Sequence, residues 1–314
     1  MKFTSLTFDS KFNLGKFDVE YSYGPGLFKS FRNVMEQYIP RYSLCDIEIK
    51  NVKSDYKPEQ IVHKIRLINI NQKLKNFNYD NYKFNVNLKN NNNNRAVVLA
   101  KNLLDKRLCV ENIFLMTFEP TWEMNISGKL KKSTKYIENN GYHNVISNIS
   151  QKPIVENKKY KIEIQLLECF EFKTLLDLTM SKMIDLFTDF YKIVDKITID
   201  DTVTNGKLFM TDNPIYDSTI YEPIKNRLST KPKEVWCGYA PEHPRSNIYV
   251  LTIIDSVYHD ESNILKYAIN DILNTLKKIK KNINNTNIQT MKKMNVTDNF
   301  NYSKVYSTLK VTTL

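Results

Sequence analysis

Two segments of the chain repeat one pattern of hydrophobic and polar positions. Each begins with alternating apolar and polar residues, passes through a short acidic break, and continues with apolar residues spaced three and four apart. The segments are 160–195 and 247–281. A period of two predicts a half-buried strand, and a period near 3.6 predicts an amphipathic helix. The pattern therefore predicts a strand followed by a long helix, used twice in one chain.

A second repeated pattern precedes each of these segments. A strand leads into a shorter helix and then a turn that ends at proline, over 16–40 and again over 207–232. In the first copy, residues 17–23 alternate as a strand does, and 27–39 has helical spacing until Pro40 ends the helix. This repetition indicates two copies of one module that pair with each other, which is more typical of a scaffold than of a catalyst.

The shorter helix of the second copy carries two local signals. Asp217 stands at its predicted start, where the carboxylate can accept a hydrogen bond from a free backbone N–H, so we predict that it caps the helix. Pro223 lies about one turn inside the same helix, where it removes a backbone hydrogen bond and can kink the helix.

The two long helices have wide apolar stripes that need cover. Each apolar side chain removed from water contributes about 1.5–3 kcal/mol, so exposing either stripe would forfeit on the order of ten kcal/mol, as much as a domain's net stability. We therefore predict that the stripes of 174–195 and 262–281 pack against each other within one molecule. The side chains predicted at this contact are Leu176, Met183, Phe187, Leu265, Ile269 and Ile272.

The region between the first short helix and the first long helix differs in composition. Residues 45–49 alternate as a strand, whereas the periodicity of 59–70 does not decide between helix and strand. From 71 to 159 short strand-like stretches alternate with polar turns, and the tract Asn90–Asn94 is predicted to be a loop. The chain thus reads as an α+β protein with two modules of antiparallel sheet plus long helix, the first interrupted by a β-rich insert. The predicted organisation is a first module in 1–50 and 160–195, an insert in 51–159, a linker in 196–206, a second module in 207–283 and a polar tail in 284–314.

Composition narrows the protein class. The chain has 314 residues, of which 41% are hydrophobic, enough for substantial cores. It has no run of about 18 apolar residues and no apolar stretch near its start, so we expect an intracellular protein that does not contact membranes. Its four cysteines, far apart in sequence, predict neither a disulfide framework nor a zinc site. They are Cys45, Cys109, Cys169 and Cys237.

The net charge of +12 leaves a second function class open. Lysine and arginine displace counterions from phosphate, so a stand-alone basic nucleic-acid-binding protein is the main alternative. However, the lysines are scattered among asparagine and isoleucine, a mixture that AT-biased coding also produces, which favours a solvated basic surface.

Catalytic signals are weak. The chain has no glycine-rich phosphate loop, no His pair with metal-ligand spacing and no magnesium-type aspartate cluster, so we expect no catalytic residue, metal or cofactor. A hydrolase that uses Cys237 and His243 is a weaker alternative, since a buried structural cysteine and a turn-stabilising histidine are the commoner reading of both.

Residues 217–254 resemble the small α-like subunit of multisubunit RNA polymerases, of the eleventh-subunit type. The matching positions, in order, are Asp217, Thr219, Ile220, Gly238, Tyr239, Pro241, His243 and Pro244. The first half resembles the larger α-like partner, of the third-subunit type. This similarity comes from the helix of 27–40, from QIVHKIRLINI at 60–70 and from Gly141-Tyr142-His143. The family usually has Arg and Gly where Lys64 and Arg66 stand, and Pro where Asn69 stands; the four-Cys zinc loop of some relatives is missing.

The resemblance implies two α-like dimerisation modules fused in one chain, as some large cytoplasmic DNA viruses encode them. Such a protein is the non-catalytic assembly platform of a DNA-directed RNA polymerase. Its implied partners are the two large catalytic subunits and other small polymerase subunits, with DNA and RNA contacted only indirectly. Its implied location is the cytoplasm of the host cell, and the virion. The residues implied for docking the large subunits are Arg32, His63, Lys64 and Arg66.

Overall fold

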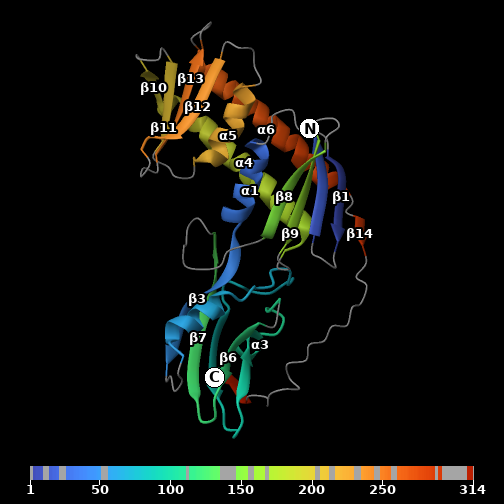
Figure 1. Ribbon diagram of the computed structural model, residues 1–314, viewed down its shortest axis with the longest axis vertical. Coiled ribbons are helices and arrows are strands. Elements are labelled where there is room, and N and C mark those ends of the chain that lie inside the picture. Colours follow the sequence, from blue (N-terminus) through green and yellow to red (C-terminus); the bar gives the residue numbers. More distant parts are fainter. Residues whose placement is uncertain are drawn as a thin grey trace. The chain divides into compact units, whose positions relative to one another are not determined.

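The structure of the protein is a computed structural model of residues 1–314 (Figure 1). The structure describes residues 3–9, 14–20, 26–50, 56–110, 113–134, 146–154, 159–166, 170–201, 206–211, 216–229, 235–243, 248–255, 260–286, 289–291 and 310–313. The chain forms two compact units. Unit 1 comprises Met1–Ile39, Asn148–Gln165 and Phe172–Met291, and unit 2 comprises Pro40–Ser147, Leu166–Glu171 and Lys292–Leu314. The α+β fold class predicted from the sequence is confirmed.

The first half of unit 1 is built on a five-stranded sheet. Its strands are β1 (Phe3–Asp9), β2 (Leu14–Glu20), β8 (Ile146–Ile154), β9 (Lys159–Leu166) and β14 (Gln289–Met291), in the order β14-β1-β2-β9-β8. β2 pairs antiparallel with β1 and with β9, whereas β14 pairs parallel with β1. Two helices, α1 (Gly26–Gln37) and α4 (Phe172–Ile193), belong to this half, and the 3-10 helix η1 (Val194–Lys196) follows α4.

The first residue of α4, Phe172, packs closely against this sheet. The ring of Phe172 stacks on Phe8 with a centroid distance of 5.6 Å. It also lies directly over Gly15, where a Cβ atom would come within 2.2 Å of the ring. Because only a residue without a side chain leaves that space, Gly15 allows α4 to begin against the sheet.

The second half of unit 1 has a four-stranded antiparallel sheet and two helices. The strands are β10 (Thr198–Asp201), β11 (Gly206–Thr211), β12 (Val235–Pro241) and β13 (Tyr249–Asp255), in the order β10-β11-β13-β12. The helices are α5 (Ser218–Leu228) and α6 (Glu261–Asn285). One face of the sheet is fully buried through Phe209, Leu251 and Ile253, and α5 and α6 contact these strands. These buried residues give the sheet an apolar core face.

Unit 2 contains the predicted β-rich region. Its main sheet, in the order β15-β4-β7-β3, comprises β3 (Arg41–Lys50), β4 (Lys83–Lys89), β7 (Glu123–Ser133) and β15 (Lys310–Thr313). β5 (Ala96–Leu99) pairs with β6 (Phe114–Phe118), and the helices are α2 (Pro58–Arg66) and α3 (Ala100–Leu103). The Asn tract is a loop, held by the buried Asn90, whose amide donates to the carbonyls of Asn94 (3.0 Å) and Phe118 (2.9 Å).

The segment that periodicity left undecided is the helix α2. Its two buried residues, Ile61 and Ile65, are four apart and lie in the unit 2 core, which explains why the chain is helical here. Ile68 and Ile70 are also buried in that core, but after the helix has ended. The mixed periodicity of 59–70 therefore reflects a helix and an extended stretch packed on the same core.

The structure changes several predicted boundaries. The segment expected to be a linker, 196–206, includes β10, which pairs with β11 along its full length. β3, expected in the first module, belongs to unit 2 because it pairs with β7; β8, expected in the insert, lies beside β9 in the first-half sheet.

The predicted polar tail also contributes strands. β14 extends the first-half sheet and β15 pairs with β4 in unit 2. Strand pairing uses backbone groups, so a polar segment can join a sheet edge without any apolar pattern to announce it. Among the described residues, no helix is long and apolar enough to cross a membrane.

Candidate assembly interface

The two long helices, α4 and α6, pack antiparallel in unit 1 (Figure 1). Lys173 at the start of α4 donates to the carbonyl oxygens of Asn284 (3.0 Å) and Thr286 (3.4 Å) at the end of α6. At the other end of the pair, Lys266 forms an ion pair with Asp195, just beyond α4, with an N–O distance of 2.6 Å. A cation at the carbonyl end of a helix also complements the helix dipole, so the Lys173 contacts both close the pair and cap α6.

Between these ends, Lys280 links the helices. Its ammonium donates to Ser181 Oγ at 2.7 Å and lies 3.7 Å from an Asp177 oxygen. Residues 177 and 181 are one helical turn apart, so both face the same lysine. Near the end of α6, residues 277–281 form a basic run of four lysines and Ile279. The contact of Lys280 gives one member of that run a structural role.

The apolar residues predicted at this contact are all buried. None of the six is more than 2% exposed: Leu176, Met183, Phe187, Leu265, Ile269 and Ile272. Because three belong to α4 and three to α6, and the two helices contact each other, the two stripes are covered within one molecule as the hydrophobic argument requires.

A second helix pair, α1 with α5, also joins the halves. The two helices come close at Gly26, where a Cβ atom would lie 2.2 Å from Asn226 Nδ2 and 2.9 Å from the carbonyl oxygen of Glu222. Real Cβ atoms do not come this close to backbone. Gly26 therefore sets how tightly the start of α1 fits against α5.

The same crossing accommodates the proline inside α5. In a regular helix the N–H of residue 223 would donate to the carbonyl of Thr219, but Pro223 has no N–H. Instead the hydroxyl of Ser30, in α1, donates to that Thr219 carbonyl. Ser30 and Thr219 are both buried, and Asn33 of α1 also donates to Thr219 Oγ1 at 3.3 Å. A hydrogen bond lost within the second half is thus replaced by one from the first half.

An aromatic cluster completes the contact between the halves. Phe190 of α4 lies 5.1 Å from the ring of Tyr216 and 5.6 Å from the ring of Tyr221, measured between centroids. Tyr221 in turn lies 6.0 Å from Tyr239 and 6.3 Å from Tyr249. Phe190 is fully buried, so a first-half side chain fills a second-half aromatic pocket.

Burial controls the chemistry of this cluster. It raises the pKa of Tyr221 well above its usual value. Burial, followed by its hydrogen bond to Glu222, likewise raises the pKa of Tyr239, whose hydroxyl donates to that carboxylate. Both phenols stay neutral at physiological pH; Tyr221 serves as a packing group, and Tyr239 also as a hydrogen-bond donor.

Asp217 begins α5 in the role expected from the sequence. It is the N-cap residue, and its carboxylate accepts a hydrogen bond from the backbone N–H of Thr219 at 2.6 Å. Since Thr219 also meets Ser30 and Asn33, the cap fixes the turn of α5 that contacts α1.

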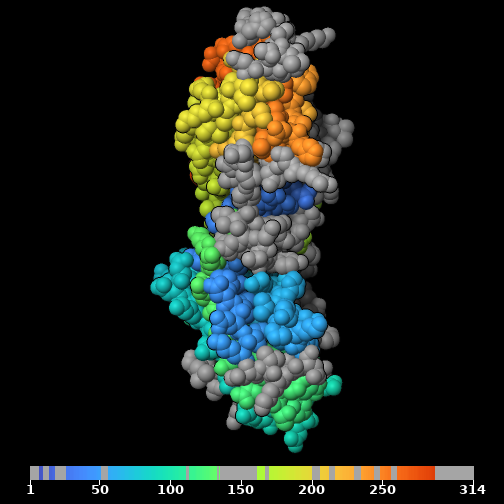
Figure 2. Space-filling view, turned by 90° about the vertical axis from the view of Figure 1, so that its left-hand side faces the viewer, coloured from blue at the N-terminus to red at the C-terminus, as the bar shows by residue number. Residues whose placement is uncertain are grey.

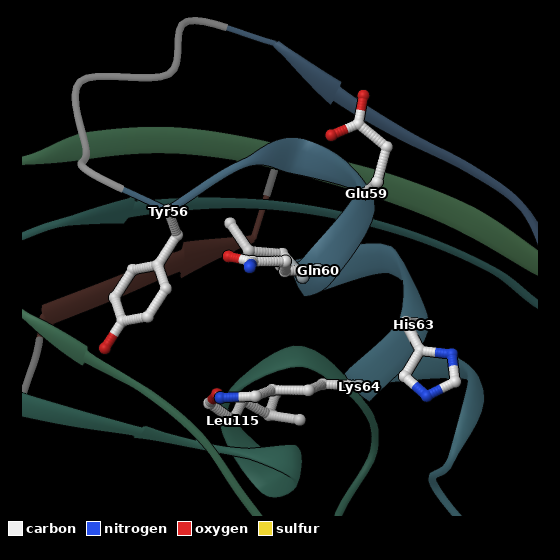
Figure 3. A pocket seen from close by; sticks show the side chains of 7 residues that line it. Tyr56, Glu59, Gln60, His63, Lys64 and Leu115 are labelled. Carbon is white, nitrogen blue, oxygen red and sulfur yellow. The ribbon is translucent and has the colours of Figure 1, made fainter.

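Two residues implied for docking, His63 and Lys64, line a cavity of about 540 Å³ in unit 2. The other lining residues are Tyr56, Glu59, Gln60, Ile61 and Leu115. Figure 3 shows Lys64 and Gln60 reaching from α2 toward the side where Tyr56 lies, while the His63 ring lies apart from them.

Lys64 is held in place beside this cavity. Its ammonium donates to the carbonyl of Leu115 at 2.8 Å and lies 5.6 Å and 5.5 Å from the ring centroids of Tyr56 and Phe114. Cation–π contacts and a backbone acceptor already engage this charge, so Lys64 acts first as a structural link between α2 and β6.

The remaining docking residues lie elsewhere. Arg32 is in α1 of unit 1, where it pairs with Glu36 one turn later at 2.9 Å. Arg66 is at the end of α2, near enough to Asp46 to help lower the pKa of that carboxyl, although Lys129 is the main cause. The four residues thus belong to two separate units, and two of them, His63 and Lys64, line the cavity described above.

The cysteine–histidine alternative finds no support in the chemistry of Cys237. This thiol is in β12 and buried, and burial raises its pKa to about 12, so it is protonated at neutral pH. Burial also raises the pKa of Cys109 to about 11. Among the described residues, no group of three or more His, Cys, Asp or Glu side chains could hold a metal ion. Cys169, His259 and Gly141–His143 lie outside the described residues.

No protein-family model matches the chain, and a search of the curated proteins finds no match. The geometry of unit 1 is therefore the main basis for assigning a function.

Sequence reasoning missed the polar and aromatic parts of this contact. Ser30 sits on the apolar side of the predicted helix 27–39, and a proline stands inside its predicted counterpart; together these were the available signals. Lys173 and Phe190 carried no distinguishing signal, since nothing in a single helix shows what its partner offers.

Proposed function

We propose that this chain is a non-catalytic assembly platform of a DNA-directed RNA polymerase, a fusion of two α-like dimerisation modules. In this role it pairs its own halves and presents a surface to the two large catalytic subunits and other small subunits. The nucleotidyl transfer chemistry belongs to the large subunits, and DNA and RNA are contacted only through the assembly. We place it in the host cytoplasm and the virion of a large DNA virus.

The observation that carries the proposal is the intramolecular pairing of two similar strand–helix halves through α4 with α6 and α1 with α5. Two modules on one chain have an effective concentration for each other in the millimolar range. They therefore pair at any expression level. The resemblance at 217–254 supports the same role, because two of its positions contact α5. Asp217 caps this helix, and the Tyr239 hydroxyl donates to Glu222 within it.

The test is co-purification from the native context. The tagged full-length chain is expected to bring down both large polymerase subunits, identified by mass spectrometry. Recovery of the chain without either large subunit would contradict the proposal.

A matched pair of variants tests whether the pairing matters. Replacing Leu265 and Ile269, both buried, with aspartate should abolish recovery of the large subunits, because an unpaired buried charge forces the helices apart. The control replaces Tyr267 and Asn270, both exposed on the same helix, with aspartate and should leave recovery unchanged. A soluble Leu265/Ile269 variant that still assembles polymerase would refute the role of this contact.

A stand-alone nucleic-acid-binding protein is the second candidate. The observation that favours it is a lysine-rich part of the unit 2 sheet, where the exposed Lys83 and Lys129 stand directly opposite each other and Lys131 follows on β7. Two like charges side by side attract phosphate, although Lys129 also pairs with Asp46 at 2.6 Å. A salt-sensitive gel shift of bare DNA by the isolated chain, lost when Lys83 and Lys131 become glutamate, would favour this candidate.

A further inference from the structure

The second-half sheet has two apolar faces. Residues directly opposite each other on antiparallel strands point to the same side, so the pairings divide the sheet into faces. Phe209 pairs with Leu251 on the buried face. The opposite face carries a second apolar set: Ile199, Leu208, Met210, Trp236, Val250 and Ile254.

This outer face is partly open to solvent, most at its two edge strands, while Leu208, Met210, Val250 and Ile254 on the inner strands are half-buried. Trp236 is 57% exposed and Ile199 is 49% exposed, two of the largest exposed apolar side chains among the described residues. The helices that contact this sheet, α5 and α6, serve its buried face. In Figure 2 the second-half residues, yellow to orange, lie together at the surface of the face in view. Contiguous exposed apolar area of this kind is typical of an interaction site.

The first-half sheet shows that this is not a general property of the fold. Its outward positions, where side chains are described, are mainly polar: Thr7, Leu14, Lys16, Lys161, Glu163 and Gln165. Lys16 and Glu163 even form an ion pair across the strands at 3.4 Å. The outer face of the first-half sheet is therefore mainly polar, whereas the outer face of the second-half sheet is apolar.

At two glycines, the missing side chain leaves space that a neighbouring large apolar side chain occupies. At Gly238, a Cβ atom would come within 2.6 Å of the Trp236 ring, so the indole lies over the backbone of its own strand. At Gly206, a Cβ atom would meet the side chain of Ile254 at 2.8 Å. Both large side chains thus lie across the sheet and present flat apolar area, held in position before any partner arrives.

The size of this face indicates what covers it. Four strands about 4.8 Å apart, with four to seven residues of about 3.3 Å each, give roughly 380 Å². A stable dimer interface takes about 800 Å² from each partner, so a second copy of this chain would be held by only half of what it needs. An α-helix is about 10 Å wide with its side chains, so one or two helices laid on the sheet match this area.

We propose that the outer face of the β10-β11-β13-β12 sheet is a docking surface for an amphipathic helix of another protein, with Trp236, on the edge strand β12, as its main anchor. Helices already cover the other face of this sheet, and a helix docked on the outer face would remove its apolar side chains from water. This inference goes beyond the proposed function and stands whether or not the partner is a polymerase subunit.

The test places a photo-crosslinking amino acid, p-benzoylphenylalanine, at position 236 of the full-length chain in its native context. The matched control carries it at position 267, since Tyr267 is 54% exposed on α6 and does not belong to the sheet. Mass spectrometry then maps the linked segment. The expected result is a link from 236, at least fivefold above the control, to a segment of another protein whose apolar residues recur every three or four positions.

Other outcomes overturn the proposal: a link to a second copy, a link within this chain, a link to a segment without that periodicity, or no excess over position 267. A second measurement uses Trp236→Glu against Tyr267→Glu. Only the former should reduce recovery of the linked protein, by at least tenfold, while both keep the thermal midpoint of the parent chain. Because the linked protein need not be a polymerase subunit, this test can fail or succeed independently of the co-purification test.

Discussion

The hydroxyl of Ser30 replaces the backbone donor that Pro223 lacks, and this exchange can be measured. Replacing Ser30 with alanine leaves the Thr219 carbonyl without that donor in a buried place, since Ser30 is 0% and Thr219 1% exposed. Leaving a buried acceptor unsatisfied costs about 1–3 kcal/mol. We therefore expect Ser30→Ala to lower the free energy of unfolding of unit 1 by that amount.

The decisive comparison is made in a Pro223→Ala background. Alanine restores an N–H that can donate to the Thr219 carbonyl within α5, as in any regular helix. In that background Ser30→Ala should cost less than about 1 kcal/mol, so the double-mutant cycle should give a coupling energy of about 1–2 kcal/mol between residues 30 and 223.

The assay is urea unfolding read by hydrogen exchange of peptides from α1 and α5, which keeps unfolding of unit 2 out of the measurement. Ser229→Ala is the control. Ser229 donates to the Lys225 carbonyl at the exposed end of the same helix, and its loss should cost about 0.5 kcal/mol or less in both backgrounds. An equal cost of Ser30→Ala with and without Pro223 would refute the reasoning.

Three further predictions concern the same unit. Phe190→Ala should cost about 3–5 kcal/mol, because it empties a fully buried aromatic site, and urea unfolding measures this loss; a cost under 1 kcal/mol would mean that the cluster collapses or contributes little. Lys280→Met should cost at most about 1 kcal/mol, since its ion pair with Asp177 is partly exposed, and a larger loss would show that the pair is stronger than its exposure indicates. The folded chain holds the pKa of Cys237 near 12 against an ordinary value of 9.0, so from pH 9 to 12 the unfolded state binds fewer protons and stability falls as pH rises, by up to about 1.4 kcal/mol per unit. In urea titrations over that range Cys237→Ala should show a shallower decline than the parent chain, and equal slopes would contradict the assignment.

The local elements were predictable because their periodicity is strong. Both long helices were expected within a few residues of α4 and α6, and Asp217 was expected where α5 begins. Segment 59–70 was not predictable, since Ile61 and Ile65 follow helical spacing but Ile68 and Ile70 reach the same core after the helix has ended. Periodicity reports one element at a time, and here two elements share one burial pattern.

The amino-acid sequence by itself determined the amphipathic helices, the alternating strands and the need to cover two wide apolar stripes. Those properties depend on neighbours along the chain and on the removal of apolar surface from water. Only the tertiary structure decided that Ser30 serves the carbonyl left by Pro223, that β14 and β15 join separate sheets, and that one sheet keeps an open apolar face. Hydrogen-bond donors and acceptors, including those at strand edges, pair with whichever group lies near them in space. No local pattern in the sequence encodes the proximity of residues almost two hundred positions apart.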